Sequence, residues 1–162
     1  MDAHILTLVE NIAALMREKN LRMSVAESCT GGYISHLLTD LPGASQFFDL
    51  CVVSYSRHAK HAVLGVSNAT INKFGMVSEE TALEMAKSVK KTSKTGASLA
   101  VTGVAGPERL EEKDIGLVYI AVALDSITES KRLKITGTRE EIKKQAAFEA
   151  LQFFYHNLQL WT

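Results

Sequence analysis

The sequence predicts an α/β domain in which helices cover both faces of a mixed, mostly parallel sheet, a three-layer α/β/α sandwich. Two observations lead to this class. Segments with the 3.6-residue spacing of amphipathic helices alternate with short runs rich in β-branched and aromatic residues. No internal repeat, low-complexity tract or linker interrupts this alternation. We therefore expect the 162 residues, of 17.7 kDa, to form a single domain, 1–162, around one core.

Composition narrows the class of protein further. With 18 Lys+Arg and 18 Asp+Glu the formal net charge is zero, so the chain lacks the positive excess typical of nucleic-acid binding. The two cysteines show no zinc-ligand spacing, which predicts no metal site and favours a reducing compartment. Acidic residues interrupt the apolar pattern of the N-terminal segment, which is neither a signal peptide nor a membrane span. We expect a cytoplasmic protein without a nucleic-acid or membrane partner.

The first half of the chain alternates regularly between helices and strands. Helical spacing of apolar residues predicts a first helix that ends near Lys19-Asn20. The next predicted elements are a strand at 21–26, a helix at 33–38 stopped by Pro42-Gly43, a strand at 47–55, and a short helical piece at 57–64 ended by Gly65.

The second half begins with a well-marked helix. Ser78 is a favourable N-cap, and Glu79 and Glu80 lie in the first turn, where the helix dipole favours anions. That helix should run to about Thr92. Strands are predicted at 98–104, 116–124 and 132–136, the last two as antiparallel neighbours, and a final helix at 139–158.

The loop Glu27-Ser28-Cys29-Thr30-Gly31-Gly32 joins a predicted strand to a helix, where open α/β sheets bind ligands. Ser28 and Cys29 are both candidate nucleophiles. The glycines allow close backbone approach, and free N–H groups of the first helical turn could hold an anion or an oxyanion. The alternative is that Thr30 caps the helix and the glycines only relieve crowding.

A second polar segment, 54–60, ends a predicted strand and contains Tyr55 and Lys60. A lysine buried beside a site can lose its proton near neutral pH because desolvation penalises the ammonium, and the neutral amine can act as a base for serine. Ser28 and Lys60 could then form a Ser-Lys dyad. The alternative is a solvated Lys60 on a helix surface.

Two later segments are candidates for binding a substrate. The run Thr102-Gly103-Val104-Ala105-Gly106-Pro107 follows a strand and suits substrate contact, although an ordinary turn would explain Gly106-Pro107 equally well. Arg139 opens the final helix, where the dipole does not favour a cation, so it is a candidate for binding an anion such as phosphate. A solvated arginine is the alternative.

Taken together, these segments resemble the C-terminal domain of the CinA family, the nicotinamide-nucleotide amidohydrolases, over nearly the whole chain. The motifs that carry the resemblance are Ala26 to Gly32, Ser54-Tyr55-Ser56 with Lys60, Leu64-Gly65-Val66, Val77 to Glu80 with Glu84-Met85-Ala86, Thr102 to Pro107, and Gly137-x-Arg139.

The resemblance implies hydrolysis of the carboxamide of nicotinamide mononucleotide to nicotinic acid mononucleotide and ammonia, in pyridine nucleotide salvage and without a metal or cofactor. It implies Ser28 as the nucleophile, Lys60 as its general base, and Tyr55 as a neighbour that orients or relays the proton. Backbone N–H groups around Thr30, Gly31 and Gly32 are expected to hold the oxyanion. The residues expected to hold the ring and the ribose phosphate are Thr102, Gly103, Gly106 and Arg139.

The resemblance also implies a homo-oligomer. The apolar run Leu158-Gln159-Leu160-Trp161 at the end of the final helix could pack on a partner chain or on its own core.

The chain departs from the family pattern after Gly106-Pro107. Residues 108–112, Glu-Arg-Leu-Glu-Glu, replace a glycine-rich stretch, and their three carboxylates should repel a phosphate-bearing substrate unless Arg109 or Lys113 compensates. Leu50-Cys51 and Arg57 also differ from the usual residues. These departures leave an alternative function open: a catalytically weak nucleotide-binding or regulatory protein that keeps the fold and the pocket.

Overall fold

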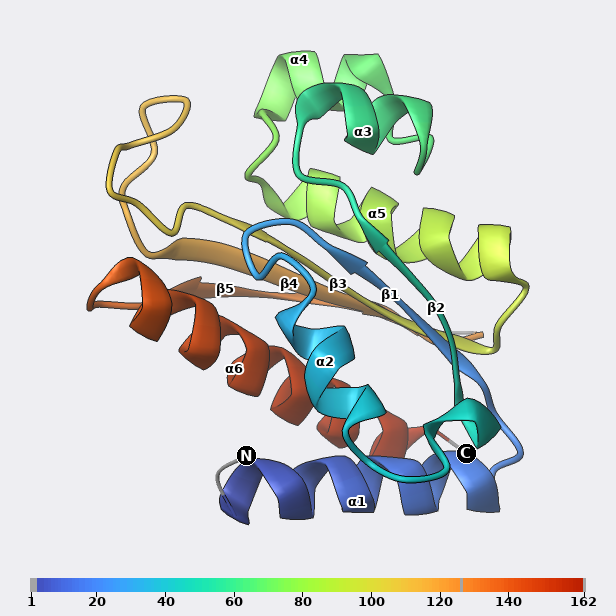
Figure 1. Cartoon of the computed structure of the whole chain (residues 1–162). Coiled ribbons are helices and arrows are strands. Elements are labelled where there is room, and N and C mark those ends of the chain that lie inside the picture. The colour runs from blue at the N-terminus through green and yellow to red at the C-terminus, as the bar shows by residue number, and fades with distance from the viewer. Residues whose placement is uncertain (1–2, 126, 162) are drawn as a thin grey trace.

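The computed structural model describes residues 3–125 and 127–161. Its single sheet has the strand order β2-β1-β3-β4-β5 (Figure 1). The strands are β1 (Met23–Glu27), β2 (Phe48–Val53), β3 (Ala97–Gly103), β4 (Leu117–Ala123) and β5 (Thr128–Lys134). β1 pairs in parallel with β2 and β3, whereas β4 pairs antiparallel with β3 and β5. The predicted mixed sheet is confirmed, and every strand except β4 points in the same direction.

Helices cover both faces of the sheet, which confirms the three layers (Figure 1). On one face lie α1 (Ala3–Glu18), α2 (Tyr33–Thr39) and α6 (Arg139–Leu160); on the other lies α5 (Glu79–Ser93), with α3 (Arg57–Ala62) and α4 (Asn68–Phe74) at one end. A 3₁₀ turn at Ala44–Gln46 leads into β2. None of these helices, within the described ranges, combines the length and the apolar character needed to cross a membrane.

Two elements differ from the sequence prediction. Helix α4 was not expected, although Ser67 caps it by accepting a hydrogen bond from Thr70 N and Gly75 ends it with φ 89°. Strand β5 begins at Thr128 rather than Arg132. Only Leu133 of β5 is buried, so the strand lacks the apolar alternation by which strands are recognised. Its charged side chains suit an edge strand, because they discourage pairing with another chain.

The sheet separates two apolar layers. Phe154 and Ile12 belong to the layer beneath α1, α2 and α6, and Met85 and Val89 belong to the layer beneath α5. β1 is buried along its whole length. Its last residue, Glu27, lies opposite Val53 of β2, and Ala26 lies opposite Ala100 of β3. The loops that follow these three parallel strands therefore meet at one edge of the sheet.

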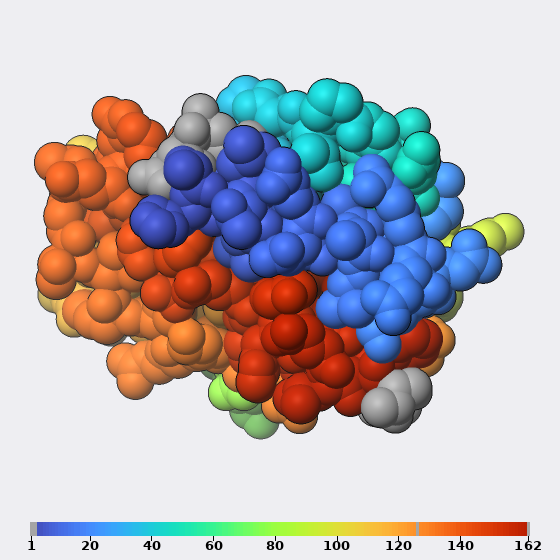
Figure 2. All heavy atoms as spheres, turned by 90° about the horizontal axis from the view of Figure 1, so that it is seen from below, coloured from blue at the N-terminus to red at the C-terminus, as the bar shows by residue number. Residues whose placement is uncertain are grey.

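The two terminal helices lie side by side, as Figure 2 shows from below. Leu158 is buried and Trp161 packs against the core. Lys19 fixes this end of the chain, because its Nζ donates to the Trp161 carbonyl at 2.6 Å and lies 5.2 Å from the indole ring. Leu160 remains 61% exposed. The C-terminal run was expected to pack either on a partner chain or on its own core, and Leu158 and Trp161 pack on the chain's own core.

Candidate active site

Ser28 and Lys60 meet where β1 ends. Ser28 directly follows β1, and Lys60 lies in α3, which starts at the cap made by Ser56 Oγ and the N–H of Ala59. Lys60 Nζ donates to Ser28 Oγ at 2.7 Å and to the carbonyl oxygen of Ser54 at 2.7 Å. Lys60 is only 1% exposed. The structure therefore brings the predicted pair together and excludes a solvated Lys60.

Burial determines the protonation of this site. It lowers the pKa of Lys60 from the usual 10.5 to about 8, although Cys29 and Glu111 favour the charged form. About a tenth of such amines are neutral at pH 7 and can accept a proton. Burial also raises the pKa of the Cys29 thiol to about 12, so Cys29 stays protonated and is a poor nucleophile. Of the two candidate nucleophiles, Ser28 is the one that Lys60 contacts.

Glu27 organises the loop, a role that its sequence position did not reveal. Its carboxylate is fully buried. It accepts hydrogen bonds from the Thr30 hydroxyl at 2.6 Å and from the N–H groups of Gly32 and Ser35, both at 2.9 Å. The N–H of Ile34 and the Ser35 hydroxyl also donate to it. The carboxylate thus occupies the positive end of the α2 dipole.

This arrangement corrects two of the three donors of the expected oxyanion site at Thr30, Gly31 and Gly32, because the N–H groups of both glycines are already bonded within the protein. The N–H of Gly31 donates to the Ser28 carbonyl at 3.1 Å, and that of Gly32 donates to Glu27. The capping role of Thr30 is wrong as well, because its hydroxyl donates to Glu27 and the N-cap is Gly32. Positive φ angles of 62° and 97° explain both glycines.

A cavity of about 110 Å³ opens beside the Ser28–Lys60 pair. The predicted residues that line it are Ser28, Lys60, Tyr55, Thr102, Gly103, Gly106 and Arg139, whereas Thr30, Gly31 and Gly32 do not. Sequence analysis missed three apolar lining residues, Met76, Val77 and Leu110. The first two lie between α4, which was not predicted, and α5.

Thr102 and Gly103 shape the cavity wall. The Thr102 hydroxyl, fully buried, donates to the carbonyl of Met76 at 2.8 Å, so its proton is already used inside the protein. Gly103 is crowded, because an added Cβ would lie 2.7 Å from Val118 Cγ2 and 3.1 Å from Cys29 Sγ. Thr102 and Gly103 thus define the form of the cavity wall. The Thr102 hydroxyl was expected to contact the substrate directly, but it is bonded to the protein instead.

Arg139 closes one side of the cavity. Its guanidinium donates to the Tyr55 hydroxyl at 2.6 Å and to the carbonyl of Gly106. Both acceptors are neutral, so no carboxylate compensates the charge of Arg139 in the described part of the chain. Tyr55 is 57% exposed, and its hydroxyl is hydrogen-bonded to Arg139 rather than to Ser28 or Lys60. The structure therefore places Tyr55 at the mouth, without the direct contact that a proton relay to the Ser28–Lys60 pair requires.

Comparisons with known proteins identify the family of the chain. Residues 5–158 match the family model described as CinA C-terminal domain. The chain belongs to the CinA C-terminal domain family.

Relatives and solved structures place the chain in the same family. It is 46% identical over 144 residues to a protein of Acetivibrio thermocellus named for competence-damage induction, covering 88% of this chain and 35% of that protein. A CinA-like protein of Kosmotoga olearia is 41% identical over 148 residues, 91% of this chain and 36% of its own length. The chain thus spans about a third of the length of these curated relatives. The crystal structure of competence damage-inducible protein A from Klebsiella pneumoniae superposes with a TM-score of 0.94 at 31% identity, covering 98% of this chain and 99% of that one.

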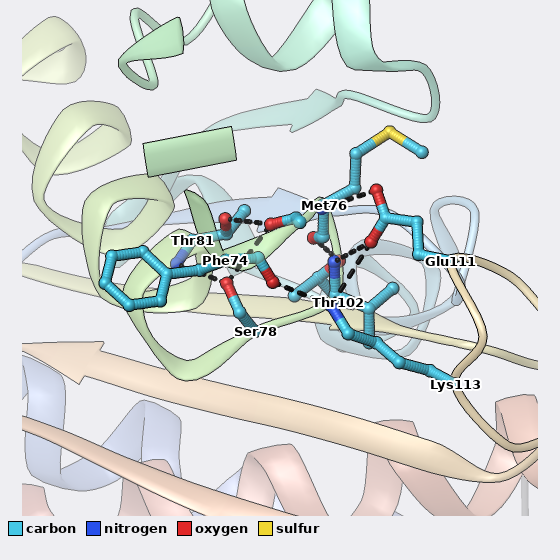
Figure 3. A network of polar contacts seen from close by, with 9 residues as sticks. Phe74, Met76, Ser78, Thr81, Thr102, Glu111 and Lys113 are labelled. Carbon is cyan, nitrogen blue, oxygen red and sulfur yellow. Dashed lines mark hydrogen bonds and ion pairs between the residues drawn. The ribbon is translucent and has the colours of Figure 1, made fainter. Parts of the chain in front are cut away.

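In this CinA domain, Glu111 and Lys113 attach the loop at 108–115 to the end of α4 and the segment that follows it (Figure 3), and Leu110 of the same loop lines the cavity. The Glu111 carboxylate accepts hydrogen bonds from the N–H groups of Met76 at 2.9 Å and Val77 at 3.4 Å. Lys113 Nζ lies 3.2 Å from it and donates to the Phe74 carbonyl at 2.7 Å. Partial burial would raise the pKa of Glu111, but these donors outweigh it and lower that pKa. Lys113 therefore compensates one of the carboxylates expected to repel a phosphate.

A hollow of about 330 Å³ adjoins the CinA site at Arg139, on α6. Tyr33, Glu140, Lys143 and Lys144 complete its lining. Lys144 pairs with Glu140 at 2.5 Å, whereas Lys143 has no ion pair within the described residues. A Cβ built on Gly31 would lie 3.6 Å from Lys143 Nζ, so this charge borders the loop that carries Ser28. Arg139 and Lys143, one turn apart on the helix, could hold an anion between them.

Proposed function

We propose that this chain hydrolyses the carboxamide of nicotinamide mononucleotide to nicotinic acid mononucleotide and ammonia through a Ser28–Lys60 dyad, as in pyridine nucleotide salvage. The observation that carries the proposal is the 2.7 Å hydrogen bond between the buried Lys60 Nζ and Ser28 Oγ. The relatives' names describe competence damage and mention no reaction, so the choice of substrate is supported by the family resemblance of the motifs.

The first step forms an ester between Ser28 and the acyl group. Neutral Lys60 accepts the Ser28 hydroxyl proton while Oγ attacks the carboxamide carbon. The resulting Lys60 ammonium, held by the Ser54 carbonyl at 2.7 Å, then donates a proton to the nitrogen. The C–N bond breaks and ammonia leaves.

The second step returns the enzyme to its starting state. Water enters where ammonia left, gives a proton to Lys60 and attacks the ester carbonyl. The bond to Ser28 Oγ breaks, Oγ recovers its proton from Lys60, and the carboxylic acid product leaves. Lys60 thus acts twice as a base and twice as an acid.

The oxyanion of each step needs hydrogen-bond donors at the cavity. Ala105 and Gly106 line the cavity, and their N–H groups make no hydrogen bond within the described residues. They take the place of Gly31 and Gly32 as the proposed donors, because a donor that is already bonded cannot strengthen its bond as charge develops.

Arg139 and Lys143 are proposed to bind the phosphate of the nucleotide. Their charges are not compensated by carboxylates in the described chain, and both lie at the hollow that adjoins the reaction cavity. A phosphate there would accept charge-assisted hydrogen bonds, and the guanidinium can offer two at once.

The test is the formation of ammonia and nicotinic acid mononucleotide by the purified protein, beside the Ser28→Ala and Lys60→Ala variants. We expect turnover in the unchanged protein and a loss of at least about 10³-fold in each variant, with the fold retained. Turnover that persists in folded Ser28→Ala would contradict the dyad. An absence of turnover in the unchanged protein would contradict the assignment of nicotinamide mononucleotide as the substrate.

The altered loop at 108–115 favours a second candidate, a nucleotide-binding or regulatory protein with weak catalysis. With Leu110 of this loop in its wall, the cavity beside Ser28 has a volume of about 110 Å³, below the roughly 300–1,000 Å³ of sites that enclose a drug-sized ligand, and this restricts productive placement of a carboxamide next to Ser28. Stabilisation of the protein by a pyridine nucleotide without ammonia release would identify this function.

A further inference from the structure

We propose that Glu111 is a specificity-determining residue: by fixing the turn at residues 110–113 over the cavity, it limits access to Ser28 to carboxamides carried on a single ring. The inference rests on the proposed function, which makes Ser28 the nucleophile, and adds what the site excludes. Glu111 does not touch the reacting atoms and acts through the position of its neighbours.

The turn adopts a backbone conformation that its own residues disfavour. Leu110 and Lys113 pair across it, with Leu110 N donating to the Lys113 carbonyl at 3.4 Å and Lys113 N donating to the Leu110 carbonyl at 2.9 Å. Between them, Glu111 and Glu112 have φ angles of 52° and 60°. Tight turns of this kind favour asparagine and glycine, and other residues persist there only where surrounding contacts hold them.

The side chain of Glu111 supplies those contacts. Its carboxylate bonds to the N–H groups of Met76 and Val77 and pairs with Lys113, which in turn donates to the carbonyl of Phe74 (Figure 3). Gly75 permits this approach, since a Cβ there would overlap the Glu111 carboxylate and the Lys113 amine. The turn is thus attached at three backbone positions, the carbonyl of Phe74 at the end of α4 and the N–H groups of Met76 and Val77 that follow it.

The attached parts are the walls of the reaction cavity. Leu110 from the turn and Met76 and Val77 from the segment all line it. The Thr102 hydroxyl, 2.8 Å from the Met76 carbonyl, connects the same segment to β3. With these walls in place, about 110 Å³ is left next to Ser28. A carboxamide and part of its ring fill that volume, so further bulk has to displace Leu110 or its support.

The test compares two reagents for Ser28 that differ in size, phenylmethanesulfonyl fluoride with a single ring and dansyl fluoride with two fused rings. With either one, Ser28 Oγ attacks sulfur, the S–O bond forms, the S–F bond breaks, fluoride leaves and the serine proton passes to Lys60. Intact mass measured over time gives the rate, and peptide mapping locates the label on Ser28. This readout does not depend on which amide is the natural substrate.

We expect Glu111→Ala to raise the rate with the dansyl reagent, relative to the phenyl reagent, by about tenfold or more. Glu112→Ala is the matched control, because Glu112 lies in the same turn with the same sign of φ and its side chain makes none of the contacts above. It should keep the original ratio. Glu111→Gln retains an acceptor for Met76 N but loses the ion pair with Lys113, so its ratio should be intermediate.

The outcomes separate this inference from the function on which it rests. Labelling of Ser28 with an unchanged ratio in both Glu111 variants refutes the specificity role alone. Glu111→Gln keeps this result meaningful should Glu111→Ala fail to fold. An absence of labelling by either reagent in every form refutes Ser28 as the nucleophile, and the inference falls with it.

Discussion

Lys60 is an ordinary surface residue by type, and its chemistry here comes from where the chain places it. Its amine is buried, yet both of its hydrogen-bond partners, Ser28 Oγ and the Ser54 carbonyl, are neutral. Because neither partner is a counter-ion that would offset the loss of hydration, burial disfavours the charged form of Lys60. A larger fraction of Lys60 is therefore the neutral amine near neutral pH, the form that can accept a proton.

This environment predicts the pH dependence of turnover. Activity requires neutral Lys60, so the rate of ammonia release should rise with pH through an apparent pKa of about 8 and level off above it. Lys60→Arg, which stays charged, should lose at least about 10²-fold across the whole range. Rates between pH 6 and 10 measure both effects. A profile that is already level at pH 6.5 would contradict Lys60 as the base.

The proximity of Ser28 and Lys60 could be predicted from the sequence, because both lie just after neighbouring strands. Ser28 follows one parallel strand and the 54–60 segment follows its neighbour, so proximity followed from topology alone. Glu27 could not be assigned in this way, because nothing in the sequence shows that a carboxylate at a strand end turns back onto the next helix. The same applies to Glu111, whose partners in the segment between α4 and α5 are more than thirty positions away.

At the scale of elements, α2 depends on Glu27 for its start. The helix has only seven residues and no side-chain cap from its N-cap, Gly32. A helix this short is marginal by itself, so its first turn relies on the buried carboxylate that accepts its N–H groups.

Glu27→Ala should therefore lower the free energy of unfolding by about 3 kcal/mol or more, since several buried donors lose their acceptor together. Chemical denaturation measures the change. Glu10→Ala, on the exposed surface of α1, is the control and should shift stability by less than about 0.5 kcal/mol. Equal effects of the two substitutions would show that Glu27 does not hold the loop.

The elements that sequence analysis missed share a physical cause. Long helices and buried strands carry their periodicity in side chains that face the core, and these were predicted to within a few residues. Helix α4 has a single buried residue, Ile71, and β5 has a single buried residue, Leu133. With so little apolar contact, neither produces a pattern that differs from a polar loop.

For the whole molecule, binding and stability are linked. A ligand that binds only the folded chain raises the free energy of unfolding by about 2.7 kcal/mol at a hundred times its Kd. In Ser28→Ala, which removes turnover, nicotinamide mononucleotide should stabilise the fold more than nicotinamide riboside, which lacks the phosphate.

Arg139→Ala in the same background should remove most of that difference, because the guanidinium is one of the two uncompensated cations proposed to hold the phosphate. Thermal unfolding with each ligand measures it. Lys144→Ala is the control, since Lys144 is already paired with Glu140. If Arg139→Ala preserves the difference between the two ligands, the phosphate lies elsewhere.

The carboxylate of Glu27 also has a consequence for how a nucleotide can be oriented. Many α/β proteins place a phosphate at the helix that follows the first strand, where backbone amides collect anions. Here the Glu27 carboxylate occupies that position, so a nucleotide would lie in the opposite orientation, with its phosphate away from the start of α2. Under the proposed function, the carboxamide of the substrate would point inward to Ser28 at the end of β1, and its phosphate would be directed outward across the beginning of α6.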